Sequence, residues 1–231
     1  MGAYLGISVI GLNIFWTHHP AAVRAGLLDY VAAQSALTLL LLLGMQTLVW
    51  TFLVQPLQHQ TTYDRLTGVC RPGAFWERTE HQFAQASRLH QPITFVFLDL
   101  DNFKALNDTQ GHAMGDAILH TFGTVLRQSA RQGDTIGRLG GEEFGWLLPG
   151  ATVPDAVAAT DRLLATFRRT TAEAGHRITC SAGVAVLPAT TQEPLSAWDL
   201  GRLADQALYQ AKAAGKNQVW VAKTPEVSTT R

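Results

Sequence analysis

The sequence contains little cysteine: Cys70 and Cys180 are the only two, they lie far apart, and neither belongs to a CxxC motif or a Cys/His cluster. This scarcity argues against a disulfide framework and a structural zinc site, and it favours a reduced, intracellular domain. A surplus of charge is lacking too, because 18 lysines and arginines balance 18 aspartates and glutamates. We therefore expect no nucleic-acid partner, which would need a basic surface.

Residues 31–54 lack any ionisable side chain. The run is long enough to cross a hydrocarbon core of roughly 30 Å as a helix, whereas the alternative, a buried core helix, is usually shorter and carries a polar stripe. Residues 2–17 are also apolar, have no features of a signal peptide, and are interpreted as a first, shorter span. Arg65, Arg71 and Arg78 follow the second span, which favours a cytoplasmic C-terminal portion.

The rest of the chain predicts one α/β domain. We expect a membrane anchor over residues 1–55, a short linker over 56–62, a soluble domain over 63–223 and a flexible tail over 224–231. Amphipathic and β-forming patterns predict helices at 71–89, 114–130, 153–169 and 195–217, and strands at 93–101, 177–188 and 218–222, with a glycine hairpin within 134–149. Helices and strands alternate but the hairpin requires an antiparallel pair, so the sheet should be mixed.

Carboxylates gather at two places in this pattern. Asp99 and Asp101 can lie on one face of a strand end, and Glu142 and Glu143 would fall close to Asp99 if the hairpin pairs with that strand. Adjacent carboxylates repel unless a cation neutralises them. Mg²⁺ or Mn²⁺ suits oxygen ligands, whereas the lack of His and Cys within these two acidic stretches disfavours zinc. Taken singly, "LDLD" and "GGEE" are also typical of ordinary acidic and glycine turns; their coincidence favours a site.

A magnesium ion held by few carboxylates is usually shared with phosphates, so the substrate should be a nucleoside triphosphate or a similar polyphosphate. Gly140 and Gly141 let the backbone approach a bulky ligand. The stretch after Asp101 can supply backbone N–H groups at a helix start, and Lys104, as phosphate partners. Neither a GxxxxGK[ST] loop nor a GxGxxG after a strand is present, so Walker-type ATPases and Rossmann dehydrogenases are poor candidates.

Several blocks occur together in this chain: "YDRLTG", "LDLDNFKALNDTQGHAMGD", "RLGGEEF", "SAGVAV" and "ADQALYQAKAAGKNQV". Together they resemble the GGDEF domain of diguanylate cyclases, which condense two GTP into cyclic di-GMP and pyrophosphate. The resemblance runs from about Tyr63 to about Val221, in the order and spacing of the family. It implies a cyclase-type α/β fold, related to the palm of polymerases, with the signature hairpin on a central sheet. It also implies a homodimer, because the product needs two facing sites, and a bacterial inner-membrane protein with its catalytic domain in the cytoplasm.

The resemblance assigns roles to individual residues. Asp99 and Glu142 would bind the metal, assisted by the backbone carbonyl of Leu100, and Glu143 would be either a further ligand or the group that helps deprotonate the attacking 3′-hydroxyl. The guanine edge would be bound by Asn107 and Asp116. The phosphates would be held by the following groups: the N–H groups of Asn102 and Phe103, and the side chains of Lys104, Lys212 and Lys216.

The resemblance further implies an RxxD product-inhibition site at Arg131 and Asp134, which Arg162 of a second copy would complete. Two departures from the family pattern stand out: Arg71, Pro72 and Gly73 replace the usual Asn-Arg-Arg, and Lys216 replaces an arginine. Two other interpretations stay open. One is a catalytically silent, membrane-anchored receptor for cyclic di-GMP, and the other is a membrane protein whose soluble domain only mediates interactions.

Overall fold

The computed structural model describes residues 21–54, 62–189 and 196–222, and it divides the chain into two compact units at Gln60. The apolar segment 2–17 and the tail 224–231 lie outside the described residues, as does the linker 56–62 apart from Thr62. The two units are described separately.

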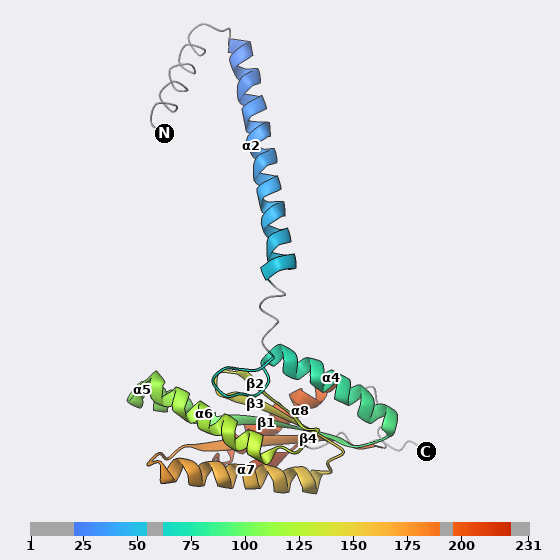
Figure 1. Cartoon of the computed structure of the whole chain (residues 1–231), viewed down its shortest axis with the longest axis vertical. Coiled ribbons are helices and arrows are strands. Elements are labelled where there is room, and N and C mark those ends of the chain that lie inside the picture. Colours follow the sequence, from blue (N-terminus) through green and yellow to red (C-terminus); the bar gives the residue numbers. More distant parts are fainter. Residues whose placement is uncertain (1–20, 55–61, 190–195, 223–231) are drawn as a thin grey trace. The chain divides into compact units, whose positions relative to one another are not determined.

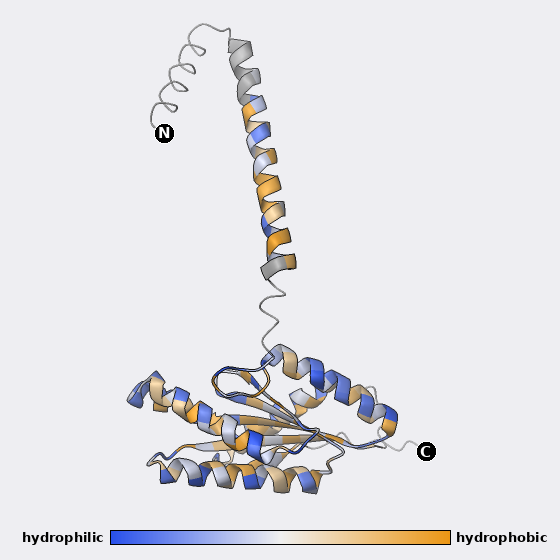
Figure 2. Ribbon diagram, viewed as in Figure 1, coloured by the Kyte–Doolittle hydropathy of each residue, from blue (hydrophilic) through white to orange (hydrophobic). Residues whose placement is uncertain are grey.

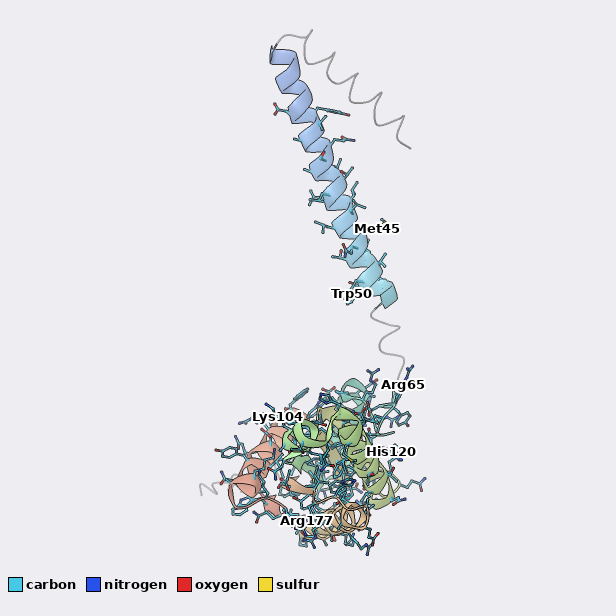
Figure 3. All side chains as sticks on the ribbon, turned by 90° about the vertical axis from the view of Figure 1, so that its left-hand side faces the viewer. Met45, Trp50, Arg65, Lys104, His120 and Arg177 are labelled. Atoms are coloured by element: carbon cyan, nitrogen blue, oxygen red, sulfur yellow. The ribbon has the colours of Figure 1, made fainter. Side chains whose placement is uncertain are left out.

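The first unit contains the helix α2 (Ala21–Val49) and a short π-helical turn η1 (Trp50–Val54). Residues Asp29–Phe52 are long and apolar enough to cross a bilayer, and none of that window is buried within the structure. Figure 2 shows the apolar residues around much of this helix, and Figure 3 shows Met45 and Trp50 on its surface. Exposed leucines in this number favour apolar surroundings.

The second unit is a five-stranded sheet with helices on both faces (Figure 1). The strand order is β2-β3-β1-β4-β5; the β4–β5 pair is parallel and the other pairs are antiparallel, which confirms the predicted mixed sheet. Its elements follow along the chain as α4 (Pro72–Leu89), β1 (Ile93–Asp101), α5 (Phe103–Gln110), α6 (His112–Ser129), β2 (Thr135–Gly140), β3 (Glu143–Pro149), α7 (Val153–Glu173), β4 (Thr179–Leu187), α8 (Ala197–Ala213) and β5 (Val219–Val221).

The central strand β1 separates two hydrophobic cores. Val96 and Leu98 pack in the core that includes α6 and α7, whereas Ile93 and Phe95 pack in the core that includes α4 and α8. Because side chains alternate along a strand, odd-numbered residues of β1 face α4 and α8. Asp99 and Asp101 continue this odd-numbered series, so the apolar strand delivers two carboxylates to the same face at its carboxyl end.

Close packing of α8 on β4 depends on Gly183. A Cβ atom at this position would lie 2.0 Å from the backbone oxygen of Ala204 and 2.2 Å from the nitrogen of Leu208. Only glycine therefore permits this approach of the helix to the sheet. Since Lys212 lies in the last turn of α8, the same contact determines where that lysine stands.

Candidate functional site

The acidic hairpin lies beside the acidic end of β1, which is the condition on which the expected approach of Glu142 and Glu143 to Asp99 depended. Asp99 is the direct partner of Glu143 in the antiparallel β1–β3 pair, and Leu100 N donates to the backbone oxygen of Glu142 at 3.3 Å. Directly opposed residues in an antiparallel pair project to the same face. Tertiary pairing thus brings together carboxylates that are more than forty positions apart in the sequence.

Asp99 is the buried member of this group, with 6 % of its surface exposed. Burial raises the pKa of its carboxyl group; the hydrogen bond and charge of Lys212 oppose that effect, and the charges of Glu142 and Glu143 add to it. The Nζ atom of Lys212 lies 2.7 Å from Asp99 Oδ2. Because the charges of Glu142 and Glu143 act against ionisation of Asp99, an additional cation at this place would stabilise its carboxylate form.

The donor set fits a hard cation that shares its ligands with a substrate. Among the described residues, no group of three or more His, Cys, Asp or Glu side chains is placed to hold a metal ion alone. Mg²⁺ needs no such cage, because it commonly takes one or two protein carboxylates and completes its shell with water and phosphate oxygens. Asp99 with the neighbouring Glu142 offers this smaller set.

The glycine turn of the hairpin is held in place by Arg138. Its Nε and Nη2 atoms donate to the backbone oxygen of Gly141 at 2.9 and 2.7 Å, and its Nη1 lies 3.4 Å from Asp64 Oδ1. A Cβ atom at Gly141 would have no neighbour within 4 Å, and at Gly140 only Glu143 Oε2, at 3.6 Å. The turn therefore presents bare backbone to open space. Sequence reasoning missed Asp64 and Arg138, although both belong to the quoted blocks "YDRLTG" and "RLGGEEF".

Lysines from α8 and from the turn that follows it reach residues near the start of α5. Lys216 Nζ donates to Asn102 Oδ1 at 2.6 Å, and Lys212 reaches Asp99 from α8. Lys104 is exposed on the first turn of α5 (Figure 3), and the neighbouring Phe103 is buried. The structure thus groups the expected phosphate partners around the junction between β1 and α5.

The residues expected at guanine lie on α5 and α6. Asn107 Oδ1 is one of two buried side-chain polar atoms without a hydrogen-bond partner among the described residues. A Cβ atom at Gly115 would lie 2.0 Å from this oxygen, so the glycine makes room for the amide. Asp116 follows directly and is exposed. An unpaired buried acceptor is costly unless a ligand supplies a donor.

A separate pocket of about 360 Å³ contains Arg131, Asp134 and Arg162. Arg162 of the same chain also lines this pocket, and the contribution of Arg162 from a second copy stays a prediction. Asp155 also lines the wall; hydrogen bonds from Thr152 lower the pKa of its carboxyl group, and the charge of Arg131 contributes. The pocket thus combines two guanidinium groups with two carboxylates.

Asp134 is satisfied by donors from its own chain. Its Oδ1 accepts from Arg131 Nε at 3.1 Å, and its Oδ2 accepts from Arg131 N at 3.1 Å and from Trp146 Nε1 at 2.9 Å. Arg131 Nη2 also donates to the oxygen of Pro149 at 2.7 Å. Sequence reasoning missed Trp146, because its position in an apolar strand predicts only core packing. The one signal for its bond to Asp134 is the indole N–H, which usually finds an acceptor when it is buried.

Residues 61–218 match the family described as "Diguanylate cyclase, GGDEF domain". The chain belongs to the GGDEF diguanylate cyclase family. Curated relatives include an uncharacterized Bacillus subtilis protein, YhcK, at 35 % identity, and the diguanylate cyclase DgcS of Shewanella oneidensis, at 34 %. The matches cover 73 % and 75 % of this chain, but only 48 % and 57 % of those two relatives. The chain therefore spans about half the length of these two relatives.

Solved GGDEF structures share the fold. The active GGEEF domain of a diguanylate cyclase from Vibrio cholerae is 31 % identical, with a TM-score of 0.63 over 68 % of this chain and 99 % of that one. The GGDEF domain of DgcB from Caulobacter crescentus, solved in complex with c-di-GMP, is 26 % identical, with a TM-score of 0.64 over 71 % of this chain and 98 % of that one. The cyclase-like fold expected from the sequence is confirmed.

Proposed function

We propose that this chain is a membrane-anchored diguanylate cyclase that condenses two GTP into cyclic di-GMP with release of pyrophosphate. One observation carries the proposal: in a member of the GGDEF family, Asp99 pairs directly with Glu143 beside an open Gly140-Gly141 turn, with Lys212 at 2.7 Å. One buried carboxylate beside a more exposed one, bare backbone and a lysine are together suited to a metal-bound triphosphate.

The side chains of Asp99 and Glu142 and the backbone carbonyl of Leu100 would hold Mg²⁺ or Mn²⁺. The cation supplies charge neutralisation on the phosphates when bound. Glu143, which is exposed, either adds a ligand or accepts the proton of the attacking 3′-hydroxyl. Together these groups would position the hydroxyl to attack the α-phosphorus of the second GTP.

The remaining substrate contacts divide between base and phosphates. Asn107 Oδ1, buried without a partner, would accept an N–H of guanine, and Asp116 beside it would accept another. The phosphate partners would be the N–H groups of Asn102 and Phe103 and the side chains of Lys104, Lys212 and Lys216, which lie around the start of α5.

Two facing copies are needed to join two GTP molecules, so the working form would be a homodimer. Residues 1–55 would anchor it in the bacterial inner membrane, with the GGDEF domain over 63–223 in the cytoplasm. The apolar Asp29–Phe52 helix supports this arrangement. The short linker 56–62 would let the membrane helices influence how the two catalytic domains face each other.

The pocket at Arg131, Asp134 and Arg162 would bind cyclic di-GMP and inhibit the enzyme. The guanidinium groups suit the phosphates and the acceptor atoms of guanine. The same pocket favours a second candidate, a catalytically silent receptor that signals on binding this nucleotide. The carboxylate set at Asp99 favours the enzyme, because a receptor has no use for it.

Mass spectrometry of nucleotides decides between the two. The purified full chain in detergent micelles is incubated with GTP and Mg²⁺, beside a Glu142→Ala chain as the control. Cyclic di-GMP from the parent alone supports the cyclase. A folded dimer that binds cyclic di-GMP but forms none supports the receptor, and binding of neither nucleotide contradicts both.

A further inference from the structure

Asp101, the last residue of β1, has no part in the proposed metal or substrate set, yet it is 2 % exposed. Its Oδ1 accepts from Ser181 Oγ at 2.7 Å, and its Oδ2 accepts from Thr179 Oγ1 at 2.7 Å and from Asn217 N at 3.1 Å. A buried carboxylate needs such donors to offset its lost hydration. Two of them belong to β4, and the third belongs to the turn after α8.

That turn has an uncommon backbone. Gly215, Lys216 and Asn217 have φ values of 117°, 64° and 51° in succession. Lysine and asparagine rarely adopt positive φ, and such conformations persist only where the surroundings hold them. The N–H of Asn217 donates to both Asp101 Oδ2 and Ser181 Oγ, each at 3.1 Å. These two acceptors fix the end of the turn to the sheet.

The turn determines the position of the Lys216 ammonium. Lys216 Nζ donates to Asn102 Oδ1 at 2.6 Å, and Asn102, the N-cap of α5, also has a positive φ of 58°. Asp101 thus accepts a hydrogen bond from Asn217, and the adjacent Asn102 accepts one from Lys216. Because the amide of Asn102 is neutral, this contact leaves the ammonium charge uncompensated at the start of a helix, where anions bind.

We propose that Asp101 is a positioning residue: by accepting from Asn217 it holds the turn after α8 against β1, so that Lys216 stands ready for a GTP phosphate. This inference rests on the proposed function for the role of Lys216. It assigns hydrogen bonding, not metal binding, to the second carboxylate of the "LDLD" sequence.

Four single variants of the full chain in detergent micelles, and the double variant that combines Asp101→Ala with Lys216→Ala, test the inference. Asp101→Ala removes both acceptors, whereas Asp101→Asn can keep an oxygen toward Asn217 and turn its amide toward Ser181. Thr179→Val is the matched control, because it removes a donor to the same Oδ2 atom without touching the turn. Lys216→Ala removes the ammonium itself. Each is assayed for GTP binding with Mg²⁺, for KM and kcat, and for hydrogen exchange at the Asn217 amide.

We expect Asp101→Ala to raise the KM for GTP roughly tenfold, close to the effect of Lys216→Ala, with a smaller change in kcat. The double variant should be no worse than Lys216→Ala, because both act through one ammonium. Asp101→Asn and Thr179→Val should stay within about threefold of the parent. Hydrogen exchange at the Asn217 amide should accelerate in Asp101→Ala but not in the other three single variants. If Asp101→Ala does not fold, Ser181→Ala should raise both KM and Asn217 exchange in the same direction.

Other outcomes overturn the inference. Equal losses in Asp101→Asn and Asp101→Ala would mean that the charge acts, as for a metal ligand. If the increases in the KM for GTP of the two single variants multiply in the double variant, Asp101 acts independently of Lys216. If Lys216→Ala binds GTP normally, or the parent binds none, the phosphate role in the proposed function fails as well. A defect in Lys216→Ala with a normal Asp101→Ala overturns the positioning role alone.

Discussion

Asp99 and Asp134 lie in the same domain, each beside a basic side chain, yet their surroundings differ. Asp99 has Lys212 at 2.7 Å and two further carboxylates near enough to raise its pKa, after the larger effect of burial. Asp134 receives three hydrogen bonds from Arg131 and Trp146, and its side chain is 1 % exposed. The first arrangement favours an incoming cation. In the second, the carboxylate mainly orients an arginine, which is left to bind a ligand.

Strand β3 joins these two environments. Glu143 at its start opposes Asp99, and Pro149 at its end accepts from Arg131 Nη2. Two sites whose aspartates are partnered differently are therefore built on one short strand. The following predictions test whether they are as different as their contacts indicate.

Asp99→Asn should have the largest effect. We expect GTP turnover to fall by roughly 100-fold or more, because the proposed metal site would lose a charged ligand. Melting temperature should not fall, because the surroundings disfavour the ionised carboxylate. Turnover and thermal unfolding of the full chain are measured beside Asp161→Asn, an exposed carboxylate on α7. A variant that keeps most of its turnover would remove Asp99 from the metal site.

Arg131→Ala should weaken cyclic di-GMP binding about tenfold or more, since it removes a bidentate donor. GTP turnover measured before product accumulates should be unchanged. Calorimetric titration with cyclic di-GMP checks this, with Arg168→Ala, an exposed arginine of α7, as the control. Equal binding by both variants would show that the pocket is not the product site.

Trp146→Phe should weaken the same binding by about threefold, because it removes one of three donors to Asp134. If the indole acts through Asp134, the substitution should matter less in an Asp134→Asn background. If Trp146→Phe weakens cyclic di-GMP binding by the same factor in the parent and in Asp134→Asn, the effect comes from packing instead. Early GTP turnover serves as the control, and it should be unaffected.

The smallest effect should be a pH dependence from Asp99. Its pKa in the folded chain is raised above the ordinary 3.8, so the folded state holds its proton more tightly than the unfolded state. Relative to Asp99→Asn, the parent should lose stability as pH rises from about 3.8 to the raised pKa, and then stay level. Thermal unfolding of both chains in metal-free buffer across that range measures the difference. A difference that moves in the opposite direction would mean that Lys212 outweighs burial.

Local patterns in the sequence were sufficient for most of the elements, although the last helix, predicted over 195–217, ends at Ala213. The apolar run 93–101 predicted β1, the paired glycines predicted the hairpin, and the spaced blocks identified the family. These features are local because they depend on side-chain alternation and on the backbone freedom of glycine. The expectation that Asp99 and Glu143 would meet rested on the assumption that β1 pairs with the hairpin.

Only the tertiary structure decided that pairing, its register and the contacts that depend on it. Trp146 bonds to Asp134, Arg138 bonds to Gly141, and Asp101 bonds to Asn217 across 116 positions. The sequence determined which elements form and which family they build, because those signals repeat within a few residues. The hydrogen bonds that orient the charged groups join distant segments, so they depend on how helices and strands pack and cannot be read from local spacing.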